Sequence, residues 1–396
     1  MSIYVIAKKG GKLRGVLCNL LQRLINYIMG FMVVGFDGSR AFQKGRTGTE
    51  NYSFQLLKSL AKIDRKNTYV VYVRPGVETG KNWPKNFQFK EISWLRFWTQ
   101  GGLVKQTFKD GLDVLFVPAH TLPLIRRPGL KTVVTVHDLG SEYLPSMHQL
   151  KQQLYLGFMQ KFQLKTATKI IAVSKATKID LINRVGIDPK KVNVVYEGYD
   201  QKLFRPVKDD TLVSSLRYYN LQPKTYFLFV GTVQPRKNLE RLIRAFAVLR
   251  PAASKLVIAG NKGWLSEEIY RLPKKLGVED RVRFLGYVPD EDLPALYCGA
   301  AALTFPSLFE GFGLPILEAQ ACGCPVLTSN VSSMPEVAGK GAVFVDPYSI
   351  DDIVKGMEQV QSSKFKVQIV KTGLENISRF SWEKCAAQTL EILESV

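Results

Sequence analysis

The sequence predicts an α/β protein built from two doubly wound parallel-sheet domains in tandem. Three observations lead to this fold: a length of 396 residues, a repeated alternation of short apolar runs with longer helical patterns, and a polar break near the middle. The length exceeds what one ordinary core requires. The composition, 46% hydrophobic and 22% charged, is that of a globular protein rather than of a disordered one.

The first domain is expected over residues 32–204. Its strand candidates are MVVGFDGS (32–39), NTYVVYV (67–73), DVLFVP (113–118), KTVVTVHDL (131–139), ATKIIAVS (167–174) and KVNVVYEG (191–198), and NYSFQLLKSLAKI (51–63) is a helix candidate. These short β-branched runs separated by helical patterns are typical of a parallel sheet with crossover helices.

The second domain is expected over residues 205–377, after an irregular polar stretch at 200–223. The strand candidates here are TYFLFVGT (225–232), KLVIAG (255–260), VRFLG (282–286), AALTFPS (301–307), CPVLTS (324–329) and GAVFV (341–345). Ligands of such sheets bind beyond the carboxyl ends of the strands, which makes the interdomain cleft the expected site. Residues 378–396 form a last helix with Ser381 as N-cap, which either packs on the second domain or crosses back to the first.

Charge and cysteine content restrict the possible partners. The 55 Lys and Arg outnumber the 34 Asp and Glu, a formal charge of +21, so the surface should attract phosphorylated ligands, acidic lipids or nucleic acid. No single module interleaves basic and aromatic residues, which argues against nucleic acid. Five scattered cysteines without a disulfide spacing suit a reducing cytoplasm. Cys322 and Cys324 lack a matching Cys/His pair and are interpreted as buried turn residues rather than half a metal site.

Residues 1–31 form a basic amphipathic N-terminal extension. Four cations precede a segment whose apolar residues share one helical face; they are Lys8, Lys9, Lys12 and Arg14, followed by Leu17, Leu20, Leu21, Leu24, Ile25 and Ile28. This pattern is typical of a helix lying on a membrane surface. The chain has no uninterrupted apolar run of 18 residues, so no clear spanning helix is expected. An upstream extension with the real start near Met32 is the alternative.

The first strand–helix turn of the second domain, FVGTVQPRKNLERLIRAF, has the features of a diphosphate clamp. Gly231 allows a sharp turn after the strand, and Arg236 and Lys237 follow near the start of a helix. Free N–H groups at a helix N-terminus already favour negative charge, so two adjacent cations there suit a diphosphate.

The stretch FEGFGLPILEAQ carries two carboxylates in different surroundings. Glu310 lies in the loop after a strand, at the expected ligand edge, with Gly311 and Gly313 permitting close approach of a ligand. Pro315 suits the first turn of the following helix, which places Glu318 about one turn into it. One carboxylate can therefore meet the reacting end of a ligand, while the other holds vicinal hydroxyls farther along.

Three further candidates rest on weaker patterns. The loop Gly45-Arg46-Thr47-Gly48-Thr49 matches neither the dinucleotide fingerprint nor a phosphate-binding loop. His137 follows a strand at its ligand-facing end, where a lone histidine is more often structural than catalytic. His120 also follows a strand and could reach an acceptor.

Together the motifs resemble a known enzyme family. The stretches FPSLFEGFGLPILEAQACGCPVLTSNVSSMPEVAG, GTVQPRKNLERLIRAF, KIIAVSKATKIDL and VVYEGYD are similar to the family-four retaining glycosyltransferases of GT-B fold, over the chain from about Met32 onward. Within that family they most resemble mannosyltransferases of bacterial surface-polysaccharide assembly.

The resemblance implies roles for the donor-site residues. Glu310 contacts the hexose of a nucleotide-sugar donor near the reacting carbon, and Glu318 holds the ribose hydroxyls. Arg236 and Lys237 neutralise the diphosphate leaving group. The backbone at Phe312, Gly313 and Leu314 lines the sugar and phosphate.

The resemblance also implies that His137 contacts the donor sugar and that the loop with Gly45 and Gly48 faces the donor phosphates and the acceptor. The final helix would return to the first domain. No cofactor or metal is expected, because the family is metal-independent and no Asp-x-Asp motif stands in a convincing loop. For a retaining enzyme of this kind, the resemblance implies that the leaving phosphate takes the acceptor proton and that Glu310 acts as an orienting group rather than as a nucleophile.

The partners implied are GDP-mannose as a first choice of donor and a glycan or polyprenol-linked acceptor, with no nucleic acid. A basic surface suits a cytoplasmic enzyme that is peripheral on the inner face of an anionic membrane. Two alternatives stay open: a sugar-nucleotide epimerase of the same fold, and a basic nucleic-acid-binding protein.

Overall fold

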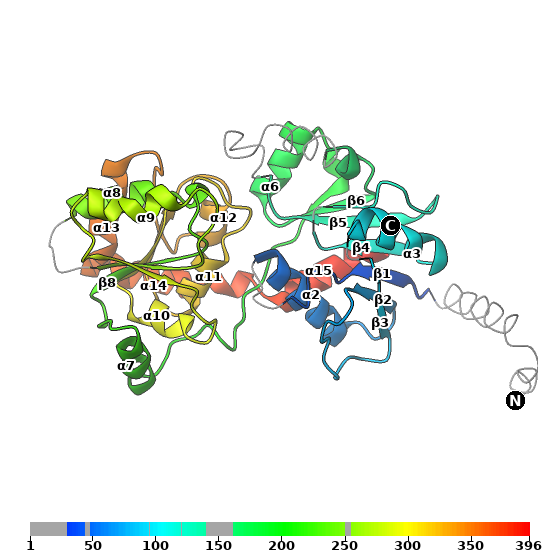
Figure 1. Cartoon of the computed structure of the whole chain (residues 1–396), viewed down its shortest axis with the longest axis horizontal. Helices are drawn as coiled ribbons and strands as arrows, with labels where there is room; N and C mark the ends of the chain where they lie inside the picture. Colours follow the sequence, from blue (N-terminus) through cyan, green and yellow to red (C-terminus); the bar gives the residue numbers. More distant parts are fainter. Residues whose placement is uncertain (1–29, 44–47, 95, 120, 140–160, 250–254) are drawn as a thin grey trace, which may run out of the picture. The chain divides into compact units, whose positions relative to one another are not determined.

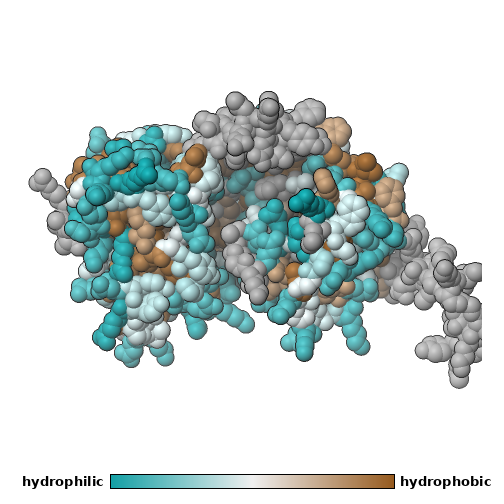
Figure 2. Space-filling model, viewed as in Figure 1, coloured by the Kyte–Doolittle hydropathy of each residue, from teal (hydrophilic) through white to brown (hydrophobic). Residues whose placement is uncertain are grey.

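The computed structural model describes residues 30–43, 48–94, 96–119, 121–139, 161–249 and 255–396. The described chain forms two parallel β-sheets with helices between the strands (Figure 1). Its surface in Figure 2 is mostly hydrophilic, with separate hydrophobic areas. The amphipathic pattern predicted for residues 16–28 lies outside the described residues.

The first sheet has seven strands in the order β3-β2-β1-β4-β5-β6-β7. They are β1 (Val33–Asp37), β2 (Thr68–Val73), β3 (Phe87–Glu91), β4 (Val114–Val117), β5 (Lys131–Val136), β6 (Lys169–Ala172) and β7 (Val192–Val194). Six of them lie within the predicted runs. Strand β3 was not predicted, because it is an edge strand with a single fully buried residue, Phe87, and so lacks a continuous apolar run.

Helices and turns connect these strands. They are α2 (Gly48–Ile63), the π-helix η2 (Trp98–Leu103), α3 (Val104–Lys109), α6 (Lys175–Asp180), the π-helix η4 (Leu181–Val185) and the 3₁₀ turn η5 (Pro189–Lys191). Helix α2 buries Tyr52, Leu56 and Leu60, spaced four residues apart, which is the one-sided pattern that predicted it.

The second sheet has six strands in the order β10-β9-β8-β11-β12-β13. They are β8 (Tyr226–Val230), β9 (Lys255–Ala259), β10 (Val282–Gly286), β11 (Ala302–Phe305), β12 (Val326–Ser329) and β13 (Val343–Val345). All six lie within the predicted runs. The direction of strand progression reverses between β8 and β11, and α/β sheets bind their ligands at the carboxyl edge of such a switch point.

Helices cover both faces of the second sheet. The helices and turns that follow β7 along the chain are α7 (Asp209–Tyr218), η6 (Pro235–Lys237), α8 (Leu239–Val248), α9 (Glu267–Lys275), α10 (Leu293–Gly299), α11 (Leu314–Ala321), α12 (Met334–Ala338), α13 (Ile350–Gln361), α14 (Ser363–Asn376), η7 (Ile377–Arg379) and α15 (Trp382–Glu394). Helices α8, α9 and α13 lie on one face and α10 and α14 on the other (Figure 1). This double covering explains why the central strands β9, β8, β11 and β12 are almost entirely buried.

The described residues divide into two compact units, one made of those from Gly30 to Val134 together with residues 390–396, and the other of those from Thr135 to Thr389. The change of sheet falls between Val194 and Tyr226, a span that includes the predicted boundary at 204, whereas the units divide earlier. Ser381 Oγ accepts from the Lys384 amide at 3.1 Å, which confirms the predicted N-cap of α15. The end of that helix belongs to the first unit, where Asn67 Nδ2 donates to Glu394 Oε1 at 3.2 Å.

No helix in the described ranges is both long and apolar enough to span a bilayer.

Candidate active site

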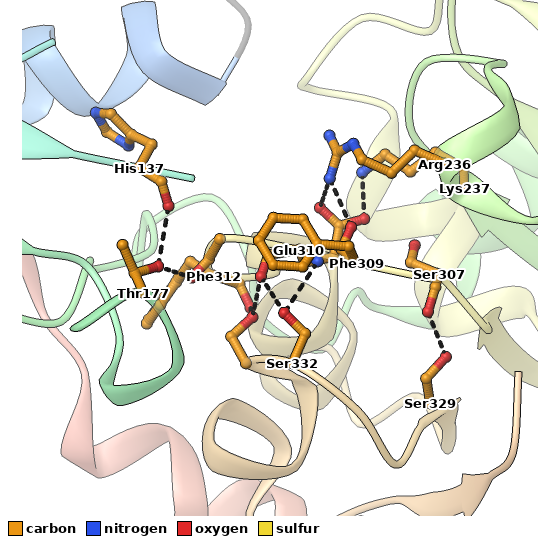
Figure 3. Close-up of polar contacts among 12 residues, drawn as sticks. His137, Thr177, Arg236, Lys237, Ser307, Phe309, Glu310, Phe312, Ser329 and Ser332 are labelled. Atoms are coloured by element: carbon orange, nitrogen blue, oxygen red, sulfur yellow. Dashed lines mark hydrogen bonds and ion pairs between the residues drawn. The ribbon is translucent and has the colours of Figure 1, made fainter. Parts of the chain in front are cut away.

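The loops after β8 and β11 bring three charged side chains together. Arg236 Nη1 lies 2.8 Å from Glu310 Oε2, and Lys237 Nζ lies 2.6 Å from Glu310 Oε1 (Figure 3). Arg236 Nη1 also donates to the Phe309 carbonyl at 2.7 Å. One carboxylate is therefore held by two cations, each bonded to a different oxygen.

This pairing determines the charge of Glu310. Burial would raise the pKa of its carboxyl, but Arg236 and Lys237 outweigh burial and hold the pKa at about 2. Glu310 in turn raises the pKa of Arg236 against the opposing effect of burial. The site at neutral pH therefore contains an ionised carboxylate between two cations, and Glu310 is a poor proton donor or acceptor there.

Serine hydroxyls hold the Glu310 loop in place. Ser332 Oγ donates to the Glu310 carbonyl at 2.6 Å, and Ser333 Oγ lies 2.9 Å from the same carbonyl and 2.7 Å from that of Phe312. The loop also passes close to another backbone segment, since a Cβ on Gly311 would lie 2.0 Å from the His137 carbonyl. Only glycine fits at residue 311 without a backbone shift.

Helix α11 begins directly after this loop. Its N-cap is Gly313 with φ +114°, which places Leu314 first and Pro315 second in the helix. The Phe312 ring is buried against Phe380 and lies 6.2 Å from Tyr196, centroid to centroid. The ring of Phe312 is thus a packing element, which leaves its backbone as the part available to a ligand.

Glu318 lies one turn into α11 with different neighbours from those of Glu310. Tyr297 Oη donates to Glu318 Oε2 at 2.8 Å. Burial raises the pKa of Glu318 to about 7, and Asp290 adds to the increase while the Tyr297 hydrogen bond opposes it. The Glu318 side chain is only partly exposed. Because its pKa is about 7, its charge changes near neutral pH.

His137, at the end of β5, pairs with a carboxylate that the sequence did not single out. His137 Nδ1 lies 3.1 Å from Glu197 Oε1, and both side chains are buried. A carboxylate only accepts, so Nδ1–H donates to Glu197 and the pair fixes the imidazole orientation. In Figure 3 the imidazole points away from Thr177, whose hydroxyl lies 3.2 Å from the His137 carbonyl and 3.4 Å from that of Gly311.

Glu336 is a second carboxylate missed at the sequence level. It accepts from the Lys175 amide at 2.9 Å, at the start of α6, and from Tyr196 Oη at 2.6 Å. Glu197 lies three residues after the end of β7 at Val194, but the predicted strand run 191–198 included it, so it did not stand out as a strand-end residue in the way that His137 did. Glu336 has no such signal, because its partners, two backbone amides and the Tyr196 hydroxyl, lie far away in the sequence.

The remaining predicted residues fall into separate places. Gly231 follows β8 with φ +144°, which agrees with the sharp turn expected there. Gly48 begins α2 in the first unit, whereas Gly45 and His120 lie outside the described residues. Cys322 and Cys324 are buried beside a turn at Gly323 (φ +67°), as predicted. Within the described ranges, no group of His, Cys, Asp or Glu side chains could hold a metal ion.

Two family descriptions match the sequence. "Glycosyltransferase Family 4" matches residues 46–203, and "Glycosyl transferases group 1" matches residues 219–373. The O-antigen chain mannosyltransferase B of Escherichia coli is 33% identical over 265 residues, which cover 66% of this chain and 69% of the relative. The O-antigen chain mannosyltransferase RfbU of Salmonella typhimurium is 26% identical over 359 residues, covering 85% and 95%.

Solved structures agree on the fold. Sucrose-phosphate synthase from Thermosynechococcus elongatus superposes with a TM-score of 0.74 at 19% identity, covering 92% of this chain and 98% of the other. Anabaena HepE, solved in complex with UDP-glucose, superposes with a TM-score of 0.70 at 18% identity, covering 92% and 99%. At these identities the superpositions establish the architecture alone. Taken with the sequence matches, they show that the chain belongs to the family-four glycosyltransferases of GT-B fold and resembles their bacterial mannosyltransferases.

Proposed function

We propose that the protein transfers a mannosyl group from GDP-mannose to a glycan or polyprenol-linked acceptor in surface-polysaccharide synthesis, with retention of anomeric configuration. The two O-antigen mannosyltransferase relatives support the sugar and the pathway class. The UDP-glucose complex of HepE supports a nucleotide sugar as the kind of donor. Family membership favours sugar transfer over the epimerase alternative.

The observation that carries the proposal is the convergence of Arg236 and Lys237 on one buried carboxylate at the carboxyl edge of the second sheet. Two fixed cations that pair with the Glu310 carboxylate in the free protein can also pair with a diphosphate in the donor complex. Negative charge grows on that diphosphate as the sugar–phosphate bond breaks, so the cations stabilise the transition state more than the ground state.

The reaction needs a proton acceptor, and Glu310 does not fit that role. A carboxyl with a pKa of about 2 is a weak base at neutral pH. In the proposed reaction the acceptor oxygen bonds to the anomeric carbon and the bond from that carbon to the phosphate oxygen breaks. The hydroxyl proton passes to the departing phosphate. Glu310 orients the hexose through hydrogen bonds to its hydroxyls.

Glu318 and His137 complete the proposed donor site. The carboxylate of Glu318 accepts from the two ribose hydroxyls while Tyr297 donates to it from the other side. Glu197 fixes the ring of His137 so that it can contact the hexose. The proposal uses no metal, and Gly231, Gly313 and Leu314 contribute backbone rather than side chains.

The proposed setting is the cytoplasmic face of an anionic membrane, with the protein bound peripherally. A formal charge of +21 suits this setting. Nucleic acid is not among the proposed partners.

A thermal-shift series with GDP, UDP, ADP and their common sugars tests the donor assignment, because a ligand that binds only the folded state raises the melting temperature. We expect a rise with GDP and GDP-mannose that disappears in the Arg236→Gln/Lys237→Gln variant. Arg271→Gln, on the exposed surface of α9, is the matched control and should keep the rise.

Transfer is tested by incubating the protein with GDP-mannose and a membrane extract as the source of acceptor. NMR then gives the anomeric configuration of the product. An inverted linkage would contradict retention. A thermal shift with UDP sugars only would replace GDP-mannose by another donor. No shift with any nucleotide, together with one from short nucleic acid, would overturn the proposal.

A further inference from the structure

A cluster of large apolar side chains stands exposed on the first unit. Their exposed fractions are 46% for Trp94, 76% for Phe97, 51% for Phe108 and 68% for Ile125. We call these four side chains the Phe97 patch. Figure 2 shows hydrophobic surface beside hydrophilic surface on the side of the molecule where α3 lies in Figure 1. Single exposed apolar residues are ordinary, whereas exposed apolar residues on neighbouring segments mark an interaction surface.

Hydrogen bonds join the segments that carry the patch. Gln100, in η2, donates through Nε2 to the Leu122 carbonyl at 3.0 Å and accepts the Leu124 amide through Oε1 at 2.9 Å. The Arg127 amide donates to Thr107 Oγ1, in α3, at 3.3 Å. The Trp94 ring lies against Gly101, where an added Cβ would be 2.4 Å from it. The residues around Trp94, η2, α3 and the loop at 121–127 therefore form one supported surface.

Cations flank the apolar side chains. Lys105 and Lys109 are exposed at the positions three before and one after Phe108, so all three occupy one face of α3. Arg96 is exposed next to Phe97. Within the described part of the chain none of these three cations takes part in an ion pair. The patch thus combines apolar rings with unpaired positive charge.

The backbone at Phe97 adds an independent observation. Phe97 is the N-cap of η2 in the left-handed region, with φ 55° and ψ 34°, a conformation that costs a non-glycine residue about 1 kcal/mol. Its ring is the most exposed of the four, so burial within the chain does not offset this cost. A partner outside the chain is what could bury the ring.

We propose that the Phe97 patch docks on the surface of an anionic lipid bilayer. Aromatic rings settle at the headgroup level and lysines pair with lipid phosphates, which is the combination present on α3 and beside it. Neutral apolar partners would leave the cations unpaired. The inference rests on the proposed function in one respect: a polyprenol-linked acceptor is presented at such a surface.

The test is cosedimentation of the full chain with vesicles of phosphatidylcholine alone or mixed with phosphatidylglycerol. Binding should require the anionic lipid and weaken with salt, because salt screens the attraction between the lysines and the lipid phosphates. The Lys105→Gln/Lys109→Gln variant should lower the partition coefficient about 25-fold, because each cation contributes a factor of about five.

The apolar half is tested with Phe97→Asn/Ile125→Ser. Asparagine tolerates the left-handed conformation, so this variant should melt no lower than the unchanged chain while binding vesicles at least ~5-fold more weakly. Tyr218→Ser, which removes an aromatic side chain 82% exposed on α7, is the matched control and should bind vesicles normally.

Three results would overturn the inference: full vesicle binding by both double variants, absence of anionic-vesicle binding by the unchanged chain, or preferential loss of binding to short nucleic acid in the variants. A lower melting temperature of Phe97→Asn alone would also count against it, since that result means the ring stabilises the fold. GDP binding, measured on the same samples, should be unchanged in every variant, so failure of the docking surface is distinguishable from failure of the donor assignment.

Discussion

At the scale of single residues, the opposite pKa shifts of two carboxylates eight residues apart define the site. Glu310 is held ionised by two cations, whereas Glu318 has one hydrogen-bond donor and a pKa near 7. The same side-chain chemistry is therefore tuned for two tasks, permanent negative charge beside the leaving group and a carboxylate that can gain a proton.

Glu310→Gln should destabilise the protein. The folded pKa of about 2 lies below the ordinary 4.5, so the ion pairs contribute about 3 kcal/mol at neutral pH, which is lost as the pH falls from about 4.5 through 2. The glutamine variant leaves two buried cations without their anion. Urea unfolding at pH 7 should show the loss, and added pyrophosphate should restore part of it. An unchanged midpoint would mean that the cations re-pair elsewhere.

Glu318 should make nucleotide binding depend on pH. Ribose hydroxyls donate to the ionised form, so GDP affinity should rise about ten-fold from pH 6 to pH 8 as the carboxyl with a pKa near 7 loses its proton. Isothermal titration gives the affinities. In Glu318→Gln the residual pH dependence should be only that of GDP itself. Equal slopes for the two proteins would exclude the ribose role.

The contribution of Glu318 to the free energy of unfolding changes with pH in the opposite direction from that of Glu310. Its folded pKa lies above the ordinary 4.5, so its contribution is fully present below about pH 4.5 and is lost as the pH rises through 7.

At the scale of elements, short loops position the site through backbone contacts as much as through side chains. Gly311→Ala should destabilise the chain by about 2 kcal/mol, because the new Cβ would meet the His137 carbonyl oxygen at 2.0 Å and its carbon at 2.7 Å. Gly48→Ala, at the start of α2 with nothing within 4 Å of its Cβ, is the control. Chemical denaturation of both variants measures the difference, and equal stability would mean that the Gly311 loop moves freely.

The sequence predicted elements well where burial made them uniform. Every strand of the second sheet was predicted, because helices on both faces require continuous apolar runs. Edge strand β3 was not, since two of its five residues are exposed and only one is buried. The proximity of Arg236, Lys237 and Glu310 follows from their positions after the carboxyl ends of neighbouring strands. Their ion pairs could not be predicted, because a sequence pattern locates a loop but not the rotamers of its side chains. The Glu197 partner of His137 was missed for the same reason.

At the scale of the whole molecule, the end of α15 completes the first unit. Leu393 is fully buried there, and Leu393→Ala should cost about 2–5 kcal/mol. Hydrogen exchange should increase in β1 and β2, since Glu394 also bonds to Asn67 just before β2. Glu391→Ala, at an exposed position on the same helix, is the control. Increased exchange confined to the second sheet would contradict this assignment of α15.

The return of α15 also affects the order in which the protein can be made. Residues 30–134 emerge from the ribosome early, yet seven residues that belong to the same unit follow only after the whole second sheet has been synthesised. Until residues 390–396 are released, the first unit lacks the buried side chain of Leu393. During synthesis the nascent first unit is consequently incomplete, and the second sheet can fold before the first unit closes.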